Sequence, residues 1–254
     1  MNWKHAVIGA TGTSHISTGT PCQDAWDSRM FGEILVCAIS DGAGSARYSD
    51  RGSKIIVASA LEFFSSIFAD AENFDQTIHD LDQSSAVSLV TEIRHQLVKE
   101  ANTSNCEISD FAGTMLVGVF HPDRSVFYQI GDGVWCVSHL NILGAVTWPH
   151  QGEYVGQTEF VTSPNAINSI QFESIQGTID FAVGMSDGLE RLALNLQARL
   201  PHAGFITPLI EIIKANHDQE LLHQSLQRFL ESERICERTD DDKSIALIAN
   251  AWLF

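Results

Sequence analysis

Three apolar runs in this chain end abruptly in an aspartate that is followed by glycine. They end at Asp41-Gly42, Asp132-Gly133 and Asp187-Gly188. Each run has the length of one buried strand, and the glycine after it leaves room for a bend or a close backbone contact. A fourth segment has the reverse order, because the acidic run 240–242 precedes the apolar run 244–249. We therefore expect four buried strands that each carry a carboxylate at one end.

Carboxylates that converge at the ends of these strands would form a site for hard divalent cations. The cluster would contain Asp41, Asp132, Asp187 and Asp241, together with Asp24. Several negative charges in one pocket raise one another's pKa, and a bound cation relieves the repulsion. Oxygen ligands favour Mg²⁺ or Mn²⁺ over Zn²⁺. Two such ions about 3.5–4 Å apart can activate a water and hold a phosphate, so the pattern predicts phosphoryl hydrolysis without a protein nucleophile.

Local sequence also allows purely structural roles for some of these acids. Gly131-Asp132-Gly133 joins two strand-like stretches and is a strong hairpin signal, so Asp132 could serve only a turn. Asp24 follows a loop rich in glycine, serine and threonine, where a turn acid is common. The run 240–242 could be an acidic loop, although the strand-like stretch directly after it fits the aspartate pattern better.

The order of the expected elements favours an α+β layered fold. Strands are expected over 3–10, 33–40, 112–120, 125–130, 134–139, 142–148, 179–186 and 244–252. Helices are expected over 53–68, 84–100, 189–194, 205–216 and 219–231. Strands grouped in this way indicate antiparallel sheets with helices packed outside. The irregular stretch 149–178, with short strand-like pieces at 159–162 and 169–175, has the length of a functional lid, and a plain surface excursion is the alternative.

Composition limits the classes of protein. The 254 residues contain no repeat or linker, which favours one domain over 1–254. The formal net charge of −17 argues against nucleic acid or an anionic membrane as partner, although much of it would serve solubility. We find no apolar run of membrane-spanning length and no signal peptide. Five cysteines without a CxxC pair are typical of a reduced, cytoplasmic protein.

Six short motifs occur in an order that resembles the metal-dependent protein phosphatase family, the type 2C serine/threonine phosphatases. The motifs are Cys22-Gln23-Asp24-Ala25, Ser40-Asp41-Gly42-Ala43-Gly44, Ala112-Gly113-Thr114, Ile130-Gly131-Asp132-Gly133, Ser186-Asp187-Gly188-Leu189 and Asp241-Asp242-Lys243-Ser244. Each motif alone is weak because Asp-Gly is common, but the six together span nearly the whole chain. The resemblance implies a four-layer α-β-β-α sandwich, in which two antiparallel sheets face each other between outer helices.

The resemblance also implies metal ligands. Asp41 would bridge two metal ions, with the Gly42 carbonyl as a further ligand. Asp187 and Asp241 would complete one metal site, and Asp242 is the alternative to Asp241. This makes Asp41, Asp187 and Asp241 the implied catalytic residues.

Two further aspartates receive implied roles. Asp24 would lie at the second metal site, directly or through water. Asp132 would help Asp187 to hold a third, weaker ion. The implied cofactors are therefore two or three Mn²⁺ or Mg²⁺ ions, and the stretch 149–178 would be the flap beside the active site.

The chain departs from the family pattern at several positions. Gln23 stands where members usually have glutamate, so we expect a second metal site that is weaker or shifted onto Asp24. Gly19 stands where members commonly have a phosphate-binding arginine, and His15 or Arg47 are candidates to replace it.

Two more departures concern proton transfer and the third ion. Ala43 stands where some members have a histidine proposed as general acid, which leaves metal-bound water or His15 to protonate the leaving group. Arg191 stands where many members have another acid, and the neighbouring Glu190 could compensate. The pattern is more similar to a divergent bacterial branch than to the eukaryotic enzymes.

The leading hypothesis is a Mg²⁺- or Mn²⁺-dependent phosphatase that acts on phosphoserine and phosphothreonine in proteins. The resemblance implies a serine/threonine kinase as its partner in signalling. One alternative is a hydrolase of a small phosphorylated molecule, with the same site and a different lid. Another is a weakly active, phosphatase-like binding module in kinase signalling, which Gln23 and the missing arginine favour.

Overall fold

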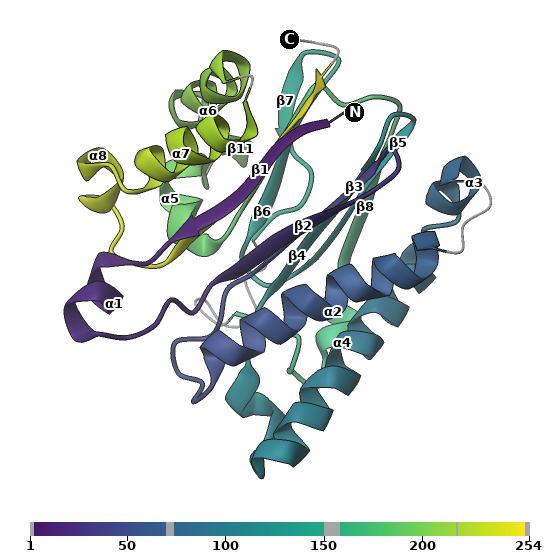
Figure 1. The fold of residues 1–254 in the computed structure, drawn as a ribbon, viewed down its shortest axis with the longest axis vertical. Helices are drawn as coiled ribbons and strands as arrows, with labels where there is room; N and C mark the ends of the chain where they lie inside the picture. The colour runs from purple at the N-terminus through teal and green to yellow at the C-terminus, as the bar shows by residue number, and fades with distance from the viewer. Residues whose placement is uncertain (1–2, 70–73, 150–157, 217, 252–254) are drawn as a thin grey trace.

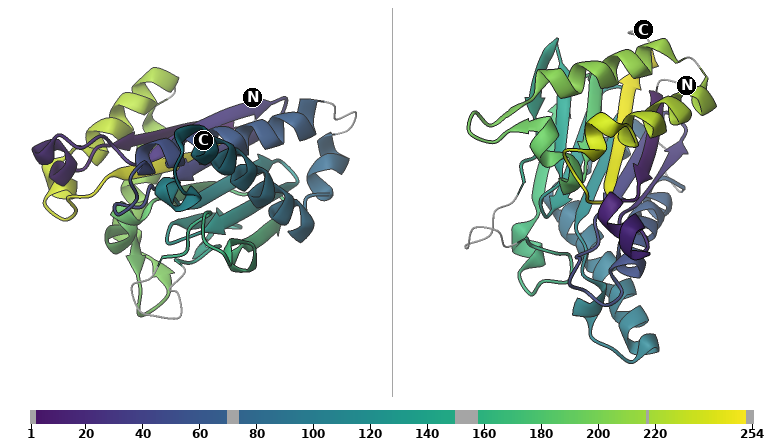
Figure 2. Two further views of the ribbon diagram at one scale, coloured as in Figure 1. Left: turned by 90° about the horizontal axis from the view of Figure 1, so that it is seen from below. Right: turned by 90° about the vertical axis from the view of Figure 1, so that its left-hand side faces the viewer.

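The computed structural model describes residues 3–69, 74–149, 158–216 and 218–251. Two five-stranded antiparallel sheets are stacked face to face, and helices cover their outer surfaces (Figure 1). Figure 2 shows the same layers from two further sides. The expected four-layer α-β-β-α sandwich is therefore confirmed.

The first sheet has the order β2-β3-β4-β5-β8. Its strands are β2 (Ala25–Phe31), β3 (Ile34–Ser40), β4 (Met115–His121), β5 (Arg124–Ile130) and β8 (Gln171–Gln176). Two long helices, α2 (Ser49–Ala69) and α4 (Gln83–Ser104), pack on its outer face, and the short α3 (Phe74–His79) lies between them in the chain. β3, β4 and β5 are buried along their whole length, since helices cover one face and the other sheet covers the opposite face.

The second sheet has the order β1-β12-β9-β6-β7. Its strands are β1 (Trp3–Ala10), β12 (Lys243–Asn250), β9 (Phe181–Met185), β6 (Val134–His139) and β7 (Ile142–Ala145). Helices α6 (Ala203–Ala215) and α7 (Gln219–Leu230) cover its outer face, with the short α5 (Glu190–Ala193) and α8 (Glu233–Cys236) nearby. A third apolar layer, which includes Leu35, Phe127, Trp135 and Ile248, fills the space between the sheets.

β1 pairs with β12 along its whole length, from Trp3 opposite Asn250 to Ala10 opposite Lys243. This pairing places the segment that follows β1 next to the acidic run that precedes β12. The segment contains the short helix α1 (Thr13–Thr18), where we had expected only a loop. Figure 2 shows α1, in purple, beside the yellow segment that leads into β12.

The predicted hairpin at Gly131-Asp132-Gly133 is wrong. β5 belongs to the first sheet and β6 to the second, so the segment crosses from one sheet to the other. Gly131 has φ of 110°, and a Cβ there would lie 2.5 Å from Thr114 Cγ2. The local sequence correctly predicted a sharp bend. It could not show that β5 and β6 pair in different sheets, because that depends on the other strands of each sheet.

Other differences concern short elements. α3 lies between the two expected helices 53–68 and 84–100, where no helix was expected, and β2 was not expected as a strand. The strand-like stretch 159–162 forms no strand, whereas the second piece of the proposed lid is β8, preceded by a 3₁₀ turn at Ala166–Ser169. Residues 150–157 of that lid lie outside the described residues.

By length and composition alone, α2 could cross a membrane, since an 18-residue window has a mean hydropathy of 1.4. Half of that window is buried inside the protein, where Ile56, Ala60 and Phe64 pack against the first sheet. Core helices of soluble proteins pass the same test, and this packing accounts for the apolar face of α2.

Candidate metal centre

Three aspartates from separate parts of the chain meet at one end of the two sheets. Asp41 follows β3, Asp132 lies in the crossing between β5 and β6, and Asp187 begins the 3₁₀ turn Asp187–Leu189 after β9. One carboxylate oxygen from each lies within 4.8 Å of the others. Because Asp41 belongs to the first sheet and Asp187 to the second, stacking of the sheets itself assembles the cluster.

Burial makes this cluster electrostatically unfavourable without a cation. Burial raises the pKa of Asp41 well above its usual range, and the charges of Asp24, Asp187 and Asp132 raise it further. Burial likewise raises the pKa of Asp187 to about 8, with added repulsion from Asp132 and Asp241. A divalent cation held by these oxygens would remove the repulsion and keep all the carboxylates ionised.

Asp132 offers direct evidence that these residues fit a metal. Its Oδ2 accepts a hydrogen bond of 2.6 Å from Thr158 Oγ1. Its Oδ1 is buried and has no hydrogen-bond partner among the described residues. A buried carboxylate oxygen without a partner is costly, and here it lies in a cluster of oxygen ligands of the kind that Mg²⁺ and Mn²⁺ prefer.

Asp24 lies against this cluster and is 4% exposed. Its Oδ2 accepts hydrogen bonds from Ser244 Oγ at 2.7 Å and from Ser186 Oγ at 2.9 Å. Burial raises the pKa of Asp24 to about 6, although both serines lower it. After burial, the charge of this neighbouring carboxyl group is the largest cause of the raised pKa of Asp41.

The structure distinguishes Asp241 from Asp242. Asp242 is 2% exposed, and both of its carboxylate oxygens are already occupied. Oδ1 accepts from the Gly12 amide at 2.6 Å, and Oδ2 accepts from the Gln23 amide at 2.6 Å and from His15 Nδ1 at 2.9 Å. Asp241 is exposed, and its charge raises the pKa of Asp187. Asp241 is therefore the residue available to a metal, and Asp242 fastens the segment around α1 to the site.

The remaining sequence-derived candidates lie around this centre in different ways. Gly42 is required by close packing, because a Cβ there would lie 2.6 Å from the Ser49 carbonyl oxygen. His15 reaches the site only through Asp242. Arg47 stacks over the Tyr48 ring at 4.9 Å, and among the described residues no hydrogen bond or ion pair joins it to the cluster. Glu190 is half-buried, and burial together with the charge of Asp132 raises its pKa.

Sequence reasoning missed the residues that support the ligands. The Asp41 amide donates to Thr114 Oγ1 at 3.0 Å, and the Thr114 amide donates to the Asp41 carbonyl at 2.8 Å. Lys243 is 1% exposed, and its ammonium group donates to the Asp241 carbonyl at 3.1 Å. Thr114 and Lys243 both lie within the six motifs, but the sequence did not show that they form hydrogen bonds with Asp41 and Asp241.

A second group that could ligate a metal lies at the turn between β4 and β5. It consists of Asp75, His121 and Asp123. His121 Nδ1 accepts from the Asp123 amide at 3.3 Å, which places the ring proton on Nε2, 3.2 Å from Asp75 Oδ1. The hydrogen bond from Asp123 and the contact between His121 and Asp75 account for the group without a metal.

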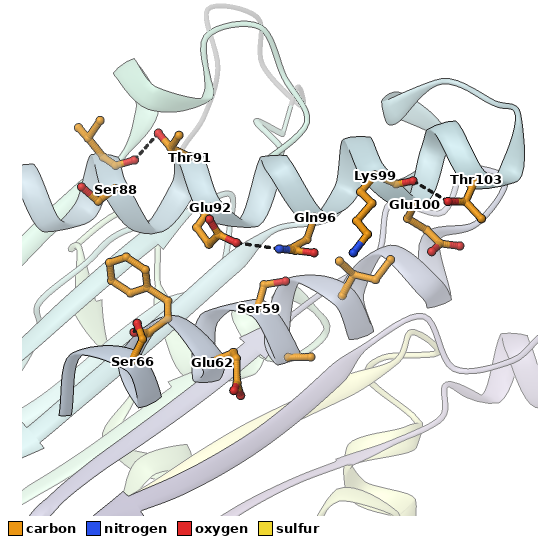
Figure 3. Close-up of a pocket in the computed structure, with 14 residues that line it drawn as sticks. Ser59, Glu62, Ser66, Ser88, Thr91, Glu92, Gln96, Lys99, Glu100 and Thr103 are labelled. Carbon is orange, nitrogen blue, oxygen red and sulfur yellow. Dashed lines mark hydrogen bonds between the residues drawn. The ribbon is translucent and has the colours of Figure 1, made fainter. Parts of the chain in front are cut away.

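A hollow of about 1040 Å³ lies apart from the clustered aspartates. It lies between α2 and α4, and Figure 3 shows its lining side chains on these two helices. Its acids have other partners: Glu62 pairs with Arg29, Glu100 pairs with Arg51, and Glu92 accepts from Gln96. None of the clustered aspartates lines it.

Half-buried carboxylates gathered at one end of two stacked antiparallel sheets form a centre that could hold a metal ion. The model of the family "Protein phosphatase 2C" matches residues 11–231. The chain is 33% identical to serine/threonine-protein phosphatase 3 of Escherichia coli (strain K12), over 97% of this chain and 98% of that protein. The chain therefore belongs to the protein phosphatase 2C family, and the enzyme class expected from the six motifs is confirmed.

Solved structures share the fold. A serine/threonine phosphatase from Staphylococcus aureus superposes with a TM-score of 0.68 at 15% identity, over 98% of this chain and 95% of that one. The S. agalactiae serine/threonine phosphatase gives a TM-score of 0.67 at 12% identity, over 98% and 99% of the two chains. At these identities the likeness concerns the arrangement of sheets and helices.

Proposed function

We propose that this protein hydrolyses phosphoserine and phosphothreonine in protein substrates, using Mn²⁺ or Mg²⁺ ions held by its aspartates. The observation that carries the proposal is the convergence of Asp41, Asp132 and Asp187, with a buried oxygen of Asp132 left without a partner. The 33% identity to a serine/threonine-protein phosphatase supports the choice of substrate.

The proposal assigns a role to the aspartates of the cluster and to the residues that support them. Asp41, Asp132, Asp187 and Asp241 would hold the ions, with Asp24 next to Asp41. When bound, the metal supplies a water of lowered pKa and neutralises charge on the phosphoryl group. Thr114 fixes the backbone of Asp41, and Lys243 fixes that of Asp241. These supports keep the carboxylates in place against their mutual repulsion.

The cellular setting is also a proposal. Five free cysteines suit a reducing cytoplasm. The net charge of −17 disfavours binding to nucleic acid or to an anionic membrane surface. A cognate serine/threonine kinase would supply the phosphorylated substrate.

The test is hydrolysis of a phosphothreonine peptide by the purified protein with Mn²⁺, with Mg²⁺ and with EDTA. Asp41→Asn should abolish turnover in either metal, because it removes a charge from the centre of the cluster. Asp75→Asn is the matched control, since it removes an exposed carboxylate outside this cluster. Turnover of small phosphate esters alone, with none of phosphopeptides, would replace the proposal by the small-molecule hydrolase.

A further inference from the structure

A smaller hollow of about 150 Å³ lies among α5, α6, α7 and α8. We call it the arginine pocket, because Arg191, Arg234 and Arg238 line it together with His202. Phe205 and Phe229 contribute aromatic walls, and their rings pack against each other with centroids 5.6 Å apart. The pocket thus combines positive charge at its rim with an apolar interior.

Among the residues that the structure describes, no carboxylate lies within ion-pair distance of the three guanidinium groups. In the parts of the chain that the structure describes, the arginines that form ion pairs are Arg29 and Arg51. Arg191 lowers the pKa of the neighbouring Glu190, but the two are not within ion-pair distance. The chain has 32 acidic residues against 15 lysines and arginines, so acidic partners are plentiful elsewhere. Like charges gathered without a counter-charge repel one another, and an anion would relieve that repulsion.

The pocket lies close to the metal centre along the chain. Arg191 follows Asp187 by four residues, through the 3₁₀ turn and the start of α5, and Arg238 precedes Asp241 by three. These separations put the backbone of the pocket within about 10 Å of two proposed metal ligands. The pocket is therefore within reach of a peptide whose phosphate lies at the aspartates, which the spacing experiment below tests.

The size of the pocket limits its occupant. Sites for drug-sized ligands are usually about 300–1,000 Å³, well above the 150 Å³ found here. The hollow suits one side chain whose anionic head meets the guanidinium groups and whose stem contacts the two phenylalanines. Arginine binds carboxylates and phosphates with two parallel hydrogen bonds, so either head group would fit.

We propose that the arginine pocket binds a second anionic side chain of the phosphoprotein substrate. This inference rests on the proposed function. At about 3.3 Å per residue, an extended substrate would place that side chain about three to five residues from the phosphorylated residue. The pocket makes the enzyme selective for acidic or multiply phosphorylated segments.

The experiment measures kcat/KM for phosphothreonine peptides that carry glutamate, phosphoserine or glutamine at each of several distances from the phosphothreonine. We expect the wild type to prefer an anionic peptide over glutamine by about five- to ten-fold at one spacing. Comparison of glutamate with phosphoserine identifies the head group. In Arg234→Gln and Arg238→Gln, the ratio of kcat/KM for the anionic peptide to that for the glutamine peptide should fall towards one, mainly because KM for the anionic peptide rises.

Arg228→Gln is the matched control. Arg228 is an exposed arginine of α7 that donates hydrogen bonds to Gln224 and Ser225 of its own helix. This variant should keep the wild-type preference. An equal loss of the anionic preference in Arg228→Gln would show a general charge effect and would overturn the pocket. Equal turnover of anionic and neutral peptides at every spacing would also overturn it.

A binding arm separates failure of the pocket from failure of the proposed function. Fluorescence anisotropy in EDTA measures binding of a labelled, unphosphorylated peptide that carries glutamates, so no turnover is needed. Binding that weakens in Arg234→Gln but not in Arg228→Gln would support the pocket even if no phosphopeptide were hydrolysed. Equal binding by all three proteins would overturn it, whatever the activity.

Discussion

The metal centre and the arginine pocket share two chain segments but differ in the sign of their charge and in their burial. Residues 187–191 and 238–242 contribute acids to one and arginines to the other. The acids Asp41 and Asp187 are half-buried at one end of the two sheets, and burial raises their pKa. The three arginines are exposed, so water and salt screen them.

The difference in burial determines whether each group of charges needs a permanent counter-charge. Buried carboxylates remain costly at all times, so they need a resident cation or protons. Exposed arginines tolerate an empty pocket and can exchange anions with every substrate. The predictions below test this contrast, beginning with the largest effect.

Asp187→Asn should have opposite effects on activity and on stability. Activity should fall by roughly 10³-fold, on the scale of the several kcal/mol that a bound metal contributes. The melting temperature in EDTA should rise by roughly 2–4 °C, because the substitution removes buried repulsion. Activity assays and thermal melts of the same preparation check both. A lower melting temperature in EDTA would contradict the electrostatic account of the cluster.

Asp242→Ala should destabilise the fold by about 3 kcal/mol, since it leaves two buried amides and His15 without their acceptor. Asp241→Ala is the contrasting variant. It should leave stability in EDTA nearly unchanged and lower activity, because Asp241 is exposed and faces Asp187. Urea unfolding with activity assays would show the two roles, and the reverse pattern would make Asp242 the ligand.

The stability of the metal-free protein should fall as pH rises from about 4 to about 8. Burial raises the pKa of Asp24 to about 6 and of Asp187 to about 8. Unfolded aspartates lose their protons near pH 4, so in this window the unfolded chain binds fewer protons than the folded one. Excess Mg²⁺ should reverse the trend, because it replaces the protons. Melting temperatures across this pH range, with EDTA and with Mg²⁺, test the sign.

Salt should affect the arginine pocket more than the metal centre. Raising the salt concentration from about 0.05 M to 0.5 M shortens the screening length and should reduce the preference for anionic peptides a few-fold. Turnover of the glutamine peptide should change less, since the buried aspartates are shielded from salt. A preference that salt leaves intact would contradict the account of exposed arginines that solvent screens.

The aspartates of the candidate metal centre could be predicted from sequence alone because each stands in a short local pattern. A buried strand that ends in an aspartate can be identified from a few residues, and Asp41 and Asp187 are of this kind. The sandwich followed from the order of the strands and from the resemblance. The single domain over 1–254 and the ligand role of each aspartate stay predictions.

What the sequence could not provide depends on contacts between distant segments. The Asp132 turn looked like a hairpin because turn chemistry does not encode which sheet receives the next strand. Asp241 and Asp242 are adjacent and identical, and only the amides of Gly12 and Gln23 separate their roles. Arg191 was noted as a departure from the family pattern, but its neighbours in the pocket lie on other helices.

The pairing of β1 with β12 has a consequence for how the enzyme is made. The first strand of the described chain can complete its sheet position only after Asn250 has left the ribosome. Asp241 and Asp242 are also synthesised at that late stage, and the hydrogen bonds that Asp242 accepts form only then. A nascent chain therefore carries Asp41, Asp132 and Asp187 before it has Asp241, so an unfinished copy lacks one of the proposed metal ligands.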